Sequence, residues 1–254
     1  MEEEEFEQDA LKDAKREAER TKILSRLIRR FHYQLNKDRQ VREYLTDERL
    51  LKHETIEKFR LGACPTLETL LQDFSEYDLR TAGIAKLDDD GHLVNKFQQN
   101  RLIIPIYDAH SRPIAVIGRF MGQEDERAKA GVAKYVNTVF SKTSCLFGLN
   151  LAYNAIRKKE AVLVVEGNFD VISAVQAGVE NVVGSSGAFF SPTQATILAR
   201  YANRVWLGLD DDEAGRKATE RVLARPQPEG LLIKKQAVPA GFKDWDEYFR
   251  SKLK

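Results

Sequence analysis

The stretch Ala161-Val-Leu-Val-Val-Glu166-Gly167-Asn-Phe-Asp170 decides the fold class of this chain. Its apolar, β-branched beginning predicts a buried strand that ends abruptly at Glu-Gly, and a helical pattern follows. A second stretch has the same plan, because Arg204-Val-Trp-Leu-Gly-Leu209 leads into Asp210-Asp-Asp212-Glu-Ala-Gly-Arg216. In an open α/β sheet, ligands bind beyond the carboxyl ends of parallel strands. The two strands therefore predict that Glu166, Asp210 and Asp212 lie together in one cleft.

Several carboxylates in one cleft are typical of a Mg²⁺ site, since hard oxygen ligands suit that ion. Asp210 and Asp212 alternate along an extended chain and should point the same way, with Asp211 pointing elsewhere. The alternative interpretation is that these residues only cap the following helices. Their repetition after two buried strands favours the site. The stretch Leu87-Asp-Asp-Asp-Gly91 repeats the acidic run without a preceding apolar strand, and it predicts an ordinary turn.

Composition limits the classes of protein that need to be considered. The 254 residues carry a formal net charge of +1, so any nucleic-acid surface must be a local patch. Cys64 and Cys145 are far apart and have no spacing typical of zinc sites or of a disulfide framework, which fits a reducing cytoplasm. The chain contains no apolar run of membrane-spanning length, and its acidic start does not resemble a signal peptide. We therefore expect a cytoplasmic protein that binds neither zinc nor membranes.

From residue 159 onward, apolar runs and helical patterns alternate. Strands are predicted at 162–165, 182–184, 205–209 and 231–236, and helices at 171–177, 192–201 and 214–224. This alternation predicts a small, Rossmann-like, mostly parallel sheet with right-handed crossovers.

The motifs of this region carry a resemblance to a known fold. Glu166-Gly167-x-x-Asp170, Gly184-x-x-Gly187 and Asp210-x-Asp212-x-Ala214-Gly215-Arg216-x-Ala218 resemble the TOPRIM fold shared by DnaG-type primases, topoisomerases and some nucleases. The resemblance implies supporting roles for Asp170, Gly167 and Gly187 beside the carboxylates.

The preceding half of the chain selects one branch of that fold. A long helix is predicted from Phe6 to Leu35, with an apolar stripe at Leu24, Leu27, Ile28 and Phe31. Val41–Pro65 reads as a helical piece, a helix is predicted over Thr66–Phe74, and apolar strands around residues 109–112 predict a β-hairpin. The segments 41–65, 97–120 and 134–149 resemble successive blocks of the DnaG-type catalytic core, which topoisomerases and TOPRIM nucleases lack. The implied fold class is an α+β N-terminal subdomain (residues 1–157) followed by an α/β TOPRIM domain (residues 158–254).

This resemblance also implies an activity and its residues. We expect metal-dependent synthesis of short RNA primers on single-stranded DNA from ribonucleoside triphosphates, a nucleotidyltransferase reaction of DNA replication. Glu166, Asp210 and Asp212 would be catalytic, and together with Asp244 and Asp246 they would hold two or more Mg²⁺ or Mn²⁺ ions. Asp244 and Asp246 also suit a plain helix N-cap. A face for the template backbone and the triphosphates would be formed by Arg101, Arg119, Lys134, Asn137 and Lys142, which could instead be ordinary solvated residues.

The chain departs from the family pattern in several respects. The zinc-binding module, the helical piece that closes the catalytic core and the helicase-binding domain are not found, the Lys134-Tyr-Val-Asn137 block reaches Phe140 early, and Leu50 stands where glycine is usual. These departures favour a phage or mobile-element primase that works with a separate helicase or template-recognition factor, or an excised core. The alternatives are a TOPRIM metal-dependent nuclease and a non-catalytic protein that binds single strands or the replisome. The primase-like N-terminal half disfavours the nuclease, and the intact carboxylates disfavour the non-catalytic protein.

Overall fold

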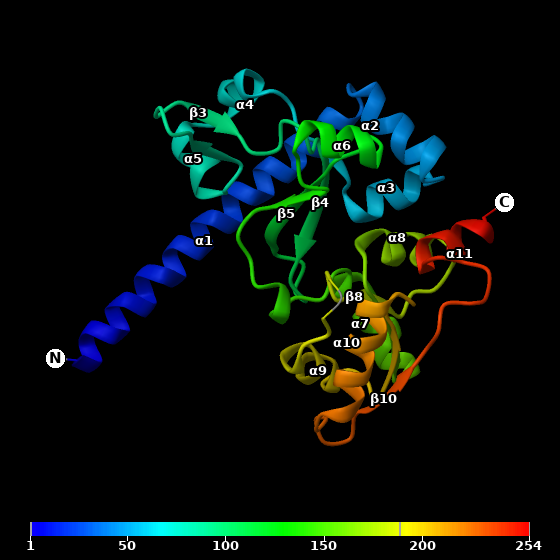
Figure 1. Cartoon of the computed structure of the whole chain (residues 1–254). Coiled ribbons are helices and arrows are strands. Elements are labelled where there is room, and N and C mark those ends of the chain that lie inside the picture. The colour runs from blue at the N-terminus through cyan, green and yellow to red at the C-terminus, as the bar shows by residue number, and fades with distance from the viewer. Residues whose placement is uncertain (1, 188, 254) are drawn as a thin grey trace. The chain divides into compact units, whose positions relative to one another are not determined.

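The computed structural model describes residues 2–187 and 189–253 and contains two compact units (Figure 1). The first unit comprises Met1–Tyr44, Arg60–Ile106 and Arg112–Phe140. The second comprises Leu45–Phe59, Tyr107–Ser111 and Ser141–Lys254. Both units are therefore built from segments that are separated in the sequence.

The first unit is organised around the long helix α1 (Glu2–Leu35). The predicted apolar stripe of this helix is confirmed, because Leu24, Leu27, Ile28 and Phe31 are all buried. Thr66 caps the next predicted helix by accepting a hydrogen bond from the backbone N–H of Thr69. The other helices of this unit are short: α2 (Arg39–Glu43), α4 (Leu67–Asp73), α5 (Glu76–Thr81) and α6 (Glu124–Ala130).

Two small sheets complete the first unit. One has the strand order β1-β4-β5-β6 and consists of β1 (Gly62–Ala63), β4 (Leu102–Tyr107), β5 (Pro113–Arg119) and β6 (Tyr135–Asn137). The consecutive strands β4 and β5 are neighbours in it, as the predicted hairpin requires. The other sheet pairs β2 (Ala85–Leu87) with β3 (Leu93–Asn95) around the predicted acidic turn. In that turn the side chain of Asp88 accepts hydrogen bonds from the backbone N–H groups of Asp90 and His92.

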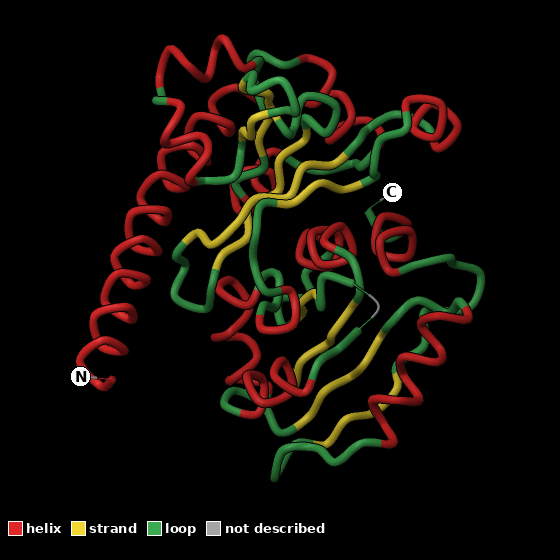
Figure 2. The backbone as a smooth tube through the Cα atoms, turned by 60° about the vertical axis from the view of Figure 1, so that its left-hand side comes forward, coloured by secondary structure: helices red, strands yellow, loops and turns green. Residues whose placement is uncertain are grey.

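The second unit contains the predicted parallel sheet. Its strand order is β10-β9-β7-β8, and every adjacent pair is parallel. The strands are β7 (Ala161–Val165), β8 (Val182–Gly184), β9 (Arg204–Gly208) and β10 (Leu232–Lys235). The helices that connect or flank them are α7 (Leu149–Lys159), α8 (Asn168–Gln176), α9 (Pro192–Ala199), α10 (Glu213–Ala224) and α11 (Trp245–Ser251). In Figure 2 these strands run side by side between helices.

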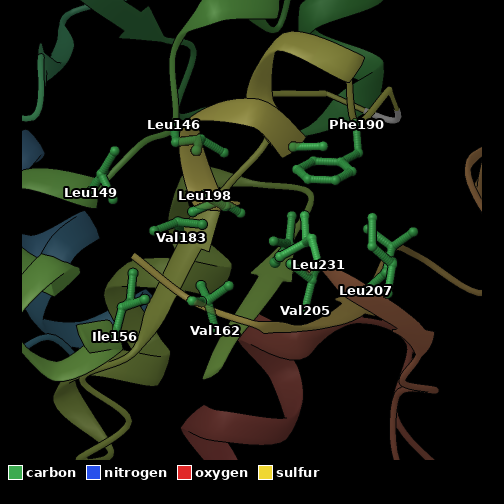
Figure 3. Close-up of a cluster of buried hydrophobic side chains, with 14 of the residues drawn as sticks. Leu146, Leu149, Ile156, Val162, Val183, Phe190, Leu198, Val205, Leu207 and Leu231 are labelled. Carbon is green, nitrogen blue, oxygen red and sulfur yellow. The ribbon is translucent and has the colours of Figure 1, made fainter. Parts of the chain in front are cut away.

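Helices lie on both faces of the sheet because the chain first moves toward one edge of the sheet and then toward the other. Helix α8 leads from β7 to β8, whereas α9 and α10 lead the opposite way, to β9 and then β10. Right-handed crossovers consequently place α8 on one face and both α9 and α10 on the other. The apolar core joins the sheet to α7, α9 and α10 through side chains that include Ile156, Val162, Leu198 and Leu207 (Figure 3). Helix α11 packs beside α8.

An early segment of the chain also belongs to the second unit. It holds all but the first residue of a π-helical turn, η1 (Tyr44–Glu48), and helix α3 (His53–Phe59), which packs against α8. The ring of Phe59 stacks on that of Phe147, with 5.7 Å between their centroids. A short 3₁₀ helix, η2 (Lys142–Ser144), precedes α7. Within the described parts of the chain, no helix is long and apolar enough to cross a bilayer.

Candidate active site

The first acidic turn lies between β7 and α8. Strand β7 ends at Val165, and Glu166 and Gly167 form the connection before the helix begins at Asn168. The carboxylate of Asp170 closes this turn, because its Oδ2 accepts a hydrogen bond of 2.7 Å from the backbone N–H of Gly167. The motif Glu-Gly-x-x-Asp is therefore a self-contained turn that presents Glu166 at the end of a buried strand.

The second acidic turn lies between β9 and α10. Asp212 is the N-cap of α10, and its Oδ1 accepts a hydrogen bond of 2.7 Å from the backbone N–H of Gly215. Residue 215 must be glycine, because a Cβ there would lie 2.1 Å from the carbonyl oxygen of Asp210. Asp211 is exposed and lies 3.5 Å from the guanidinium of Arg216. Asp210 and Asp212 therefore belong to one compact turn.

The two turns lie at the same edge of the sheet. Strands β7 and β9 are parallel neighbours, and their last residues, Val165 and Gly208, are paired. The pKa of Glu166 is raised to about 7 by burial and then by the negative charges of Asp210 and Asp212. The backbone N–H of Asp210 donates to Glu166 and offsets a part of that increase. The structure thus brings together the three carboxylates that the sequence singled out.

Asp170 and Asp244 extend this acidic region. Asp170 is buried, and burial raises its pKa to about 7 against the lowering effect of its backbone hydrogen bonds, with Asp210 and Asp244 raising it further. Asp244 is the N-cap of α11 and accepts a hydrogen bond of 2.8 Å from the backbone N–H of Glu247. Asp244 therefore caps α11, as the N-cap interpretation predicts, and its negative charge also helps to raise the pKa of Asp170.

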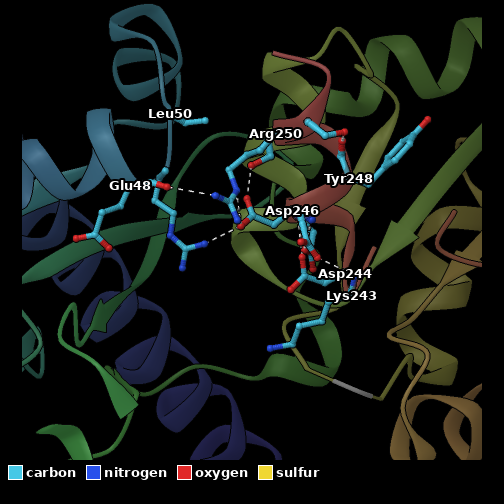
Figure 4. Close-up of polar contacts among 12 residues, drawn as sticks. Glu48, Leu50, Lys243, Asp244, Asp246, Tyr248 and Arg250 are labelled. Atoms are coloured by element: carbon cyan, nitrogen blue, oxygen red, sulfur yellow. Dashed lines mark hydrogen bonds and ion pairs between the residues drawn. The ribbon is translucent and has the colours of Figure 1, made fainter. Parts of the chain in front are cut away.

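Asp246 has a different environment from the other carboxylates. Its Oδ2 accepts from Nη1 of Arg49 at 2.6 Å and from Nε of Arg250 at 3.1 Å, and its Oδ1 accepts from the hydroxyl of Ser173 (Figure 4). Only 4% of the residue is exposed. These contacts occupy the carboxylate with protein groups, so Asp246, which the sequence predicted as a metal ligand, forms a buried ion pair in this structure.

The donor set fits a hard divalent cation. Glu166, Asp210, Asp212 and Asp244 offer only oxygen ligands. Burial, and then the negative charges of Asp210 and Asp212, raise the pKa of Glu166, and a bound cation would favour its ionised form. In residues 2–187 and 189–253, the only three metal-ligand side chains with atoms all within 4.8 Å of one another are Asp88, Asp90 and His92, in the turn of the first unit. The ligand oxygens of Glu166, Asp210 and Asp212 are therefore farther apart than the ligand atoms in that turn.

The predicted nucleic-acid residues are divided between the two units. Arg119 lies in the first unit, where its Nε donates to the hydroxyl of Tyr44 at 2.8 Å and its Nη1 donates to the hydroxyl of Tyr135. Arg101 is bound to Asp38, whose carboxylate oxygens lie 2.6 and 2.9 Å from one guanidinium nitrogen. Arg101 is therefore paired with a carboxylate of its own unit, and two tyrosine hydroxyls help to orient Arg119.

The remaining predicted residues are Lys134, Asn137 and Lys142. Lys134 lies 6.0 Å from the ring centroid of Tyr135, and Asn137 lies in the edge strand β6. Lys142 lies in the second unit with its side chain exposed. Gly187 follows β8, and its carbonyl oxygen accepts a hydrogen bond from the hydroxyl of Ser185.

Sequence reasoning missed Arg49 and Trp245. Arg49 has no local signal, since its partner Asp246 lies 197 positions away. Trp245 lies between the predicted residues Asp244 and Asp246, but its partner is 37 positions away: its indole N–H donates to the carbonyl oxygen of Gly208 at 2.9 Å.

Two family models match successive parts of this chain. The family "DNA primase catalytic core, N-terminal domain" matches residues 30–153, and the Toprim-like family matches residues 163–249. A DNA primase of Synechococcus elongatus is 35% identical over 82% of this chain and 31% of its own length. The DNA primase of Geobacillus stearothermophilus is 32% identical over 88% of this chain and 38% of its own length. The chain thus spans about a third of the length of the curated relatives it matches.

Solved structures show the same similarity in three dimensions. A DnaG primase catalytic domain bound to single-stranded DNA aligns with a TM-score of 0.81 and 28% identity, over 94% of this chain and 78% of that one. The Aquifex aeolicus primase, solved with its zinc-binding and RNA polymerase domains, aligns with a TM-score of 0.80 and 27% identity, over 93% of this chain and 58% of that one.

Proposed function

Because this chain belongs to the family of DnaG-type DNA primase catalytic cores, we propose that it synthesises short RNA primers on single-stranded DNA with the help of divalent cations. The observation that carries the proposal is the meeting of the Glu166 turn and the Asp210–Asp212 turn at one edge of the parallel sheet. A sheet of this kind serves several chemistries, so the match of residues 30–153 to the primase N-terminal domain supports primer synthesis over nuclease activity.

Under this proposal, Glu166, Asp210, Asp212 and Asp244 hold Mg²⁺ or Mn²⁺, and Asp170 fixes the turn that presents Glu166. A divalent cation bound there would stabilise the negative charge of the triphosphate during phosphoryl transfer and acidify the attacking hydroxyl. Asp246 is left out of the ligand set because two arginines and Ser173 already occupy its carboxylate.

Glu166 would either bind the cation or act as the general base. In the second case, its pKa of about 7 in the cation-free protein suits a base that works near neutral pH. Its carboxylate oxygen would accept the proton of the 3′-hydroxyl that attacks the incoming nucleotide. Arg119 and Lys134 would contact template phosphates, which fix a strand's position without reading its sequence. The cellular partner we propose is a separate replicative helicase.

The experiment uses a mixed-sequence single-stranded DNA, labelled ribonucleotides and Mg²⁺ or Mn²⁺. We expect short labelled products from the native protein and their loss, by at least about 100-fold, in Glu166→Gln and Asp210→Asn. Asp211→Asn is the matched control, since Asp211 is exposed beside the turn and its variant should retain activity. Shortening of the DNA without nucleotides would contradict primer synthesis and indicate a nuclease. If the native protein makes no product even with the cognate helicase, a binding role is favoured.

A further inference from the structure

The carboxylate of Asp246 is the centre of a buried charge cluster in the second unit. The side chains of Arg49, Arg250 and Asp246 are 16%, 27% and 6% exposed. Two guanidinium groups and one hydroxyl therefore satisfy a carboxylate that has almost no access to water (Figure 4). Charge-assisted hydrogen bonds of this kind are roughly twice as strong as neutral ones.

Both arginines are themselves held in place. The guanidinium of Arg49 lies 4.4 Å from the ring centroid of Phe169, which is the second residue of α8. Nη1 of Arg250 donates to the carbonyl oxygen of Glu48 at 3.2 Å. The cluster consequently ties the segment 45–59 to helices α8 and α11 of the same unit.

A continuous series of hydrogen bonds leads from this cluster to the Glu166 turn. The backbone N–H of Asp246 donates to Oδ1 of Asp170 at 2.9 Å. The other oxygen of Asp170 accepts from the backbone N–H of Gly167, which directly follows Glu166. The position of Asp246 therefore determines where one side of Asp170 lies, and Asp170 determines the conformation of the turn.

We propose that Arg49 is a positioning residue for the carboxylate site, and that Asp246 is the anion through which it acts and not a cation ligand. For Asp246 to bind a cation, its carboxylate would have to leave two guanidinium groups that would then be buried without an anion, which is strongly unfavourable. This inference rests on the proposed function in one respect, because it takes Glu166 to be a residue of the reacting site.

The competing interpretation, in which Asp246 binds the cation directly, predicts a different pattern of mutant effects. If Asp246 acts through Arg49, removing either residue breaks the same connection, and removing both has no further effect. If Asp246 is a ligand, its removal weakens cation binding whether or not Arg49 is present. In that case removal of Arg49 alone tightens binding, because a competing positive charge is lost.

The test is a double-mutant cycle on the full chain with Arg49→Met, Asp246→Asn and the double variant. The affinity for Mn²⁺ alone is measured from the spin-resonance signal of free Mn²⁺, without template or nucleotides. We expect each single variant to weaken Mn²⁺ binding by about 10-fold, as outer residues of metal sites do, and the double variant to resemble the singles. The proposal would be overturned if Asp246→Asn weakened Mn²⁺ binding by the same factor in the native protein and in Arg49→Met. It would also be overturned if Arg49→Met bound Mn²⁺ more tightly than the native protein.

Two further variants separate positioning from general loss of structure. Arg49→Lys keeps the charge but loses the planar fork and its stacking on Phe169, so its Mn²⁺ affinity should fall between those of Arg49→Met and the native protein. It is also the variant to measure if Arg49→Met does not fold, and unchanged or tighter Mn²⁺ binding would then count against the proposal. Arg221→Met, at an exposed position of α10, is the matched control and should bind Mn²⁺ as the native protein does.

A parallel assay of primer synthesis distinguishes this inference from the proposed function. Arg49→Met should lower kcat more than it changes KM for nucleotides, because Arg49 acts on the geometry of the reacting site. Absence of primer synthesis by the native protein, even with the cognate helicase, would refute the proposed function. The Mn²⁺ cycle would still decide whether Asp246 acts through Arg49.

Discussion

Among single residues, Leu50 has an unusual backbone conformation, with a φ of 55°. Its carbonyl oxygen accepts from Nε2 of Gln176 at 2.8 Å, and the backbone N–H of Lys52 donates to Oε1 of the same side chain at 2.6 Å. Gln176 therefore holds the loop in a conformation that costs an L-residue about 1–2 kcal/mol. This is the position at which the sequence departs from the glycine usual in the family.

We predict that Leu50→Gly is more stable than Leu50→Ala by about 1 kcal/mol, since both lose the side chain but only glycine adopts this φ without strain. Urea unfolding of the two variants measures the difference. Comparison with alanine removes the contribution of side-chain burial. An alanine variant as stable as the glycine variant would show that the loop relaxes when Leu50 is replaced.

At Glu166 we predict that cation binding depends on pH. Its folded pKa of about 7 lies above the value of an ordinary glutamate, so the cation-free protein loses stability as the pH rises from about 5 to 8. Protons and cations also compete for the carboxylate near neutral pH. Mn²⁺ should therefore raise the unfolding temperature more near pH 8 than near pH 6, as thermal unfolding with and without the ion would show. Glu166→Gln should reduce this pH dependence, and equal shifts at both pH values in the native protein would contradict the prediction.

Among the elements, α11 links the two acidic turns. Its first residue, Trp245, donates its indole N–H to the carbonyl oxygen of Gly208, at the end of β9. Its second residue, Asp246, donates its backbone N–H to Asp170, beside the end of β7. A Cβ at residue 208 would lie 2.7 Å from the indole nitrogen, so only glycine allows this approach. One short helix thereby contacts the ends of both strands that carry the site.

We predict that Trp245→Phe lowers the free energy of unfolding by about 1–3 kcal/mol, because the buried carbonyl of Gly208 loses its donor. Chemical denaturation followed by circular dichroism measures the loss. Tyr248→Phe on the same helix is the control. It removes one hydroxyl from a half-buried ring and should change stability by no more than about 0.5 kcal/mol. Similar stabilities for Trp245→Phe and the native protein would contradict the prediction.

The sequence predicted these elements where the signal was local. The apolar runs gave all four parallel strands, and the Asp-x-Asp-x-x-Gly pattern fixed the turn in which Gly215 packs on Asp210. The contacts of Asp246 were not predictable in this way, because an aspartate before a helix has the same local pattern whether it meets a cation or an arginine. Only the folded chain brings Arg49 to it.

In the whole molecule, the second unit is discontinuous in sequence. Residues 45–59 belong to it, although most of the intervening chain up to residue 140 builds the first unit. A boundary drawn at one point along the sequence, such as 157/158, does not describe a unit assembled from three segments. The early segment contributes Arg49 to Asp246 and the ring of Phe59 to Phe147.

We predict that a fragment of residues 141–254 is markedly less stable than the same unit in the full chain, because it leaves Asp246 without Arg49 and the ring of Phe147 without Phe59. Joining residues 45–59 to its N-terminus through a flexible linker should raise its unfolding midpoint. The same linker with a scrambled 45–59 sequence is the control. A bare fragment as stable as the full chain would show that the early segment contributes nothing.

The pairing of Arg49 with Asp246 also has a consequence for protein synthesis. Arg49 and Asp246 are 197 positions apart, so the two can meet only after the ribosome has made the whole intervening stretch. Contacts of such long sequence separation form late and slow folding. The nascent chain must meanwhile keep residues 45–59 accessible while the segments on either side of them fold. We therefore expect the carboxylate turn to reach its final geometry only after α11 has left the ribosomal exit tunnel.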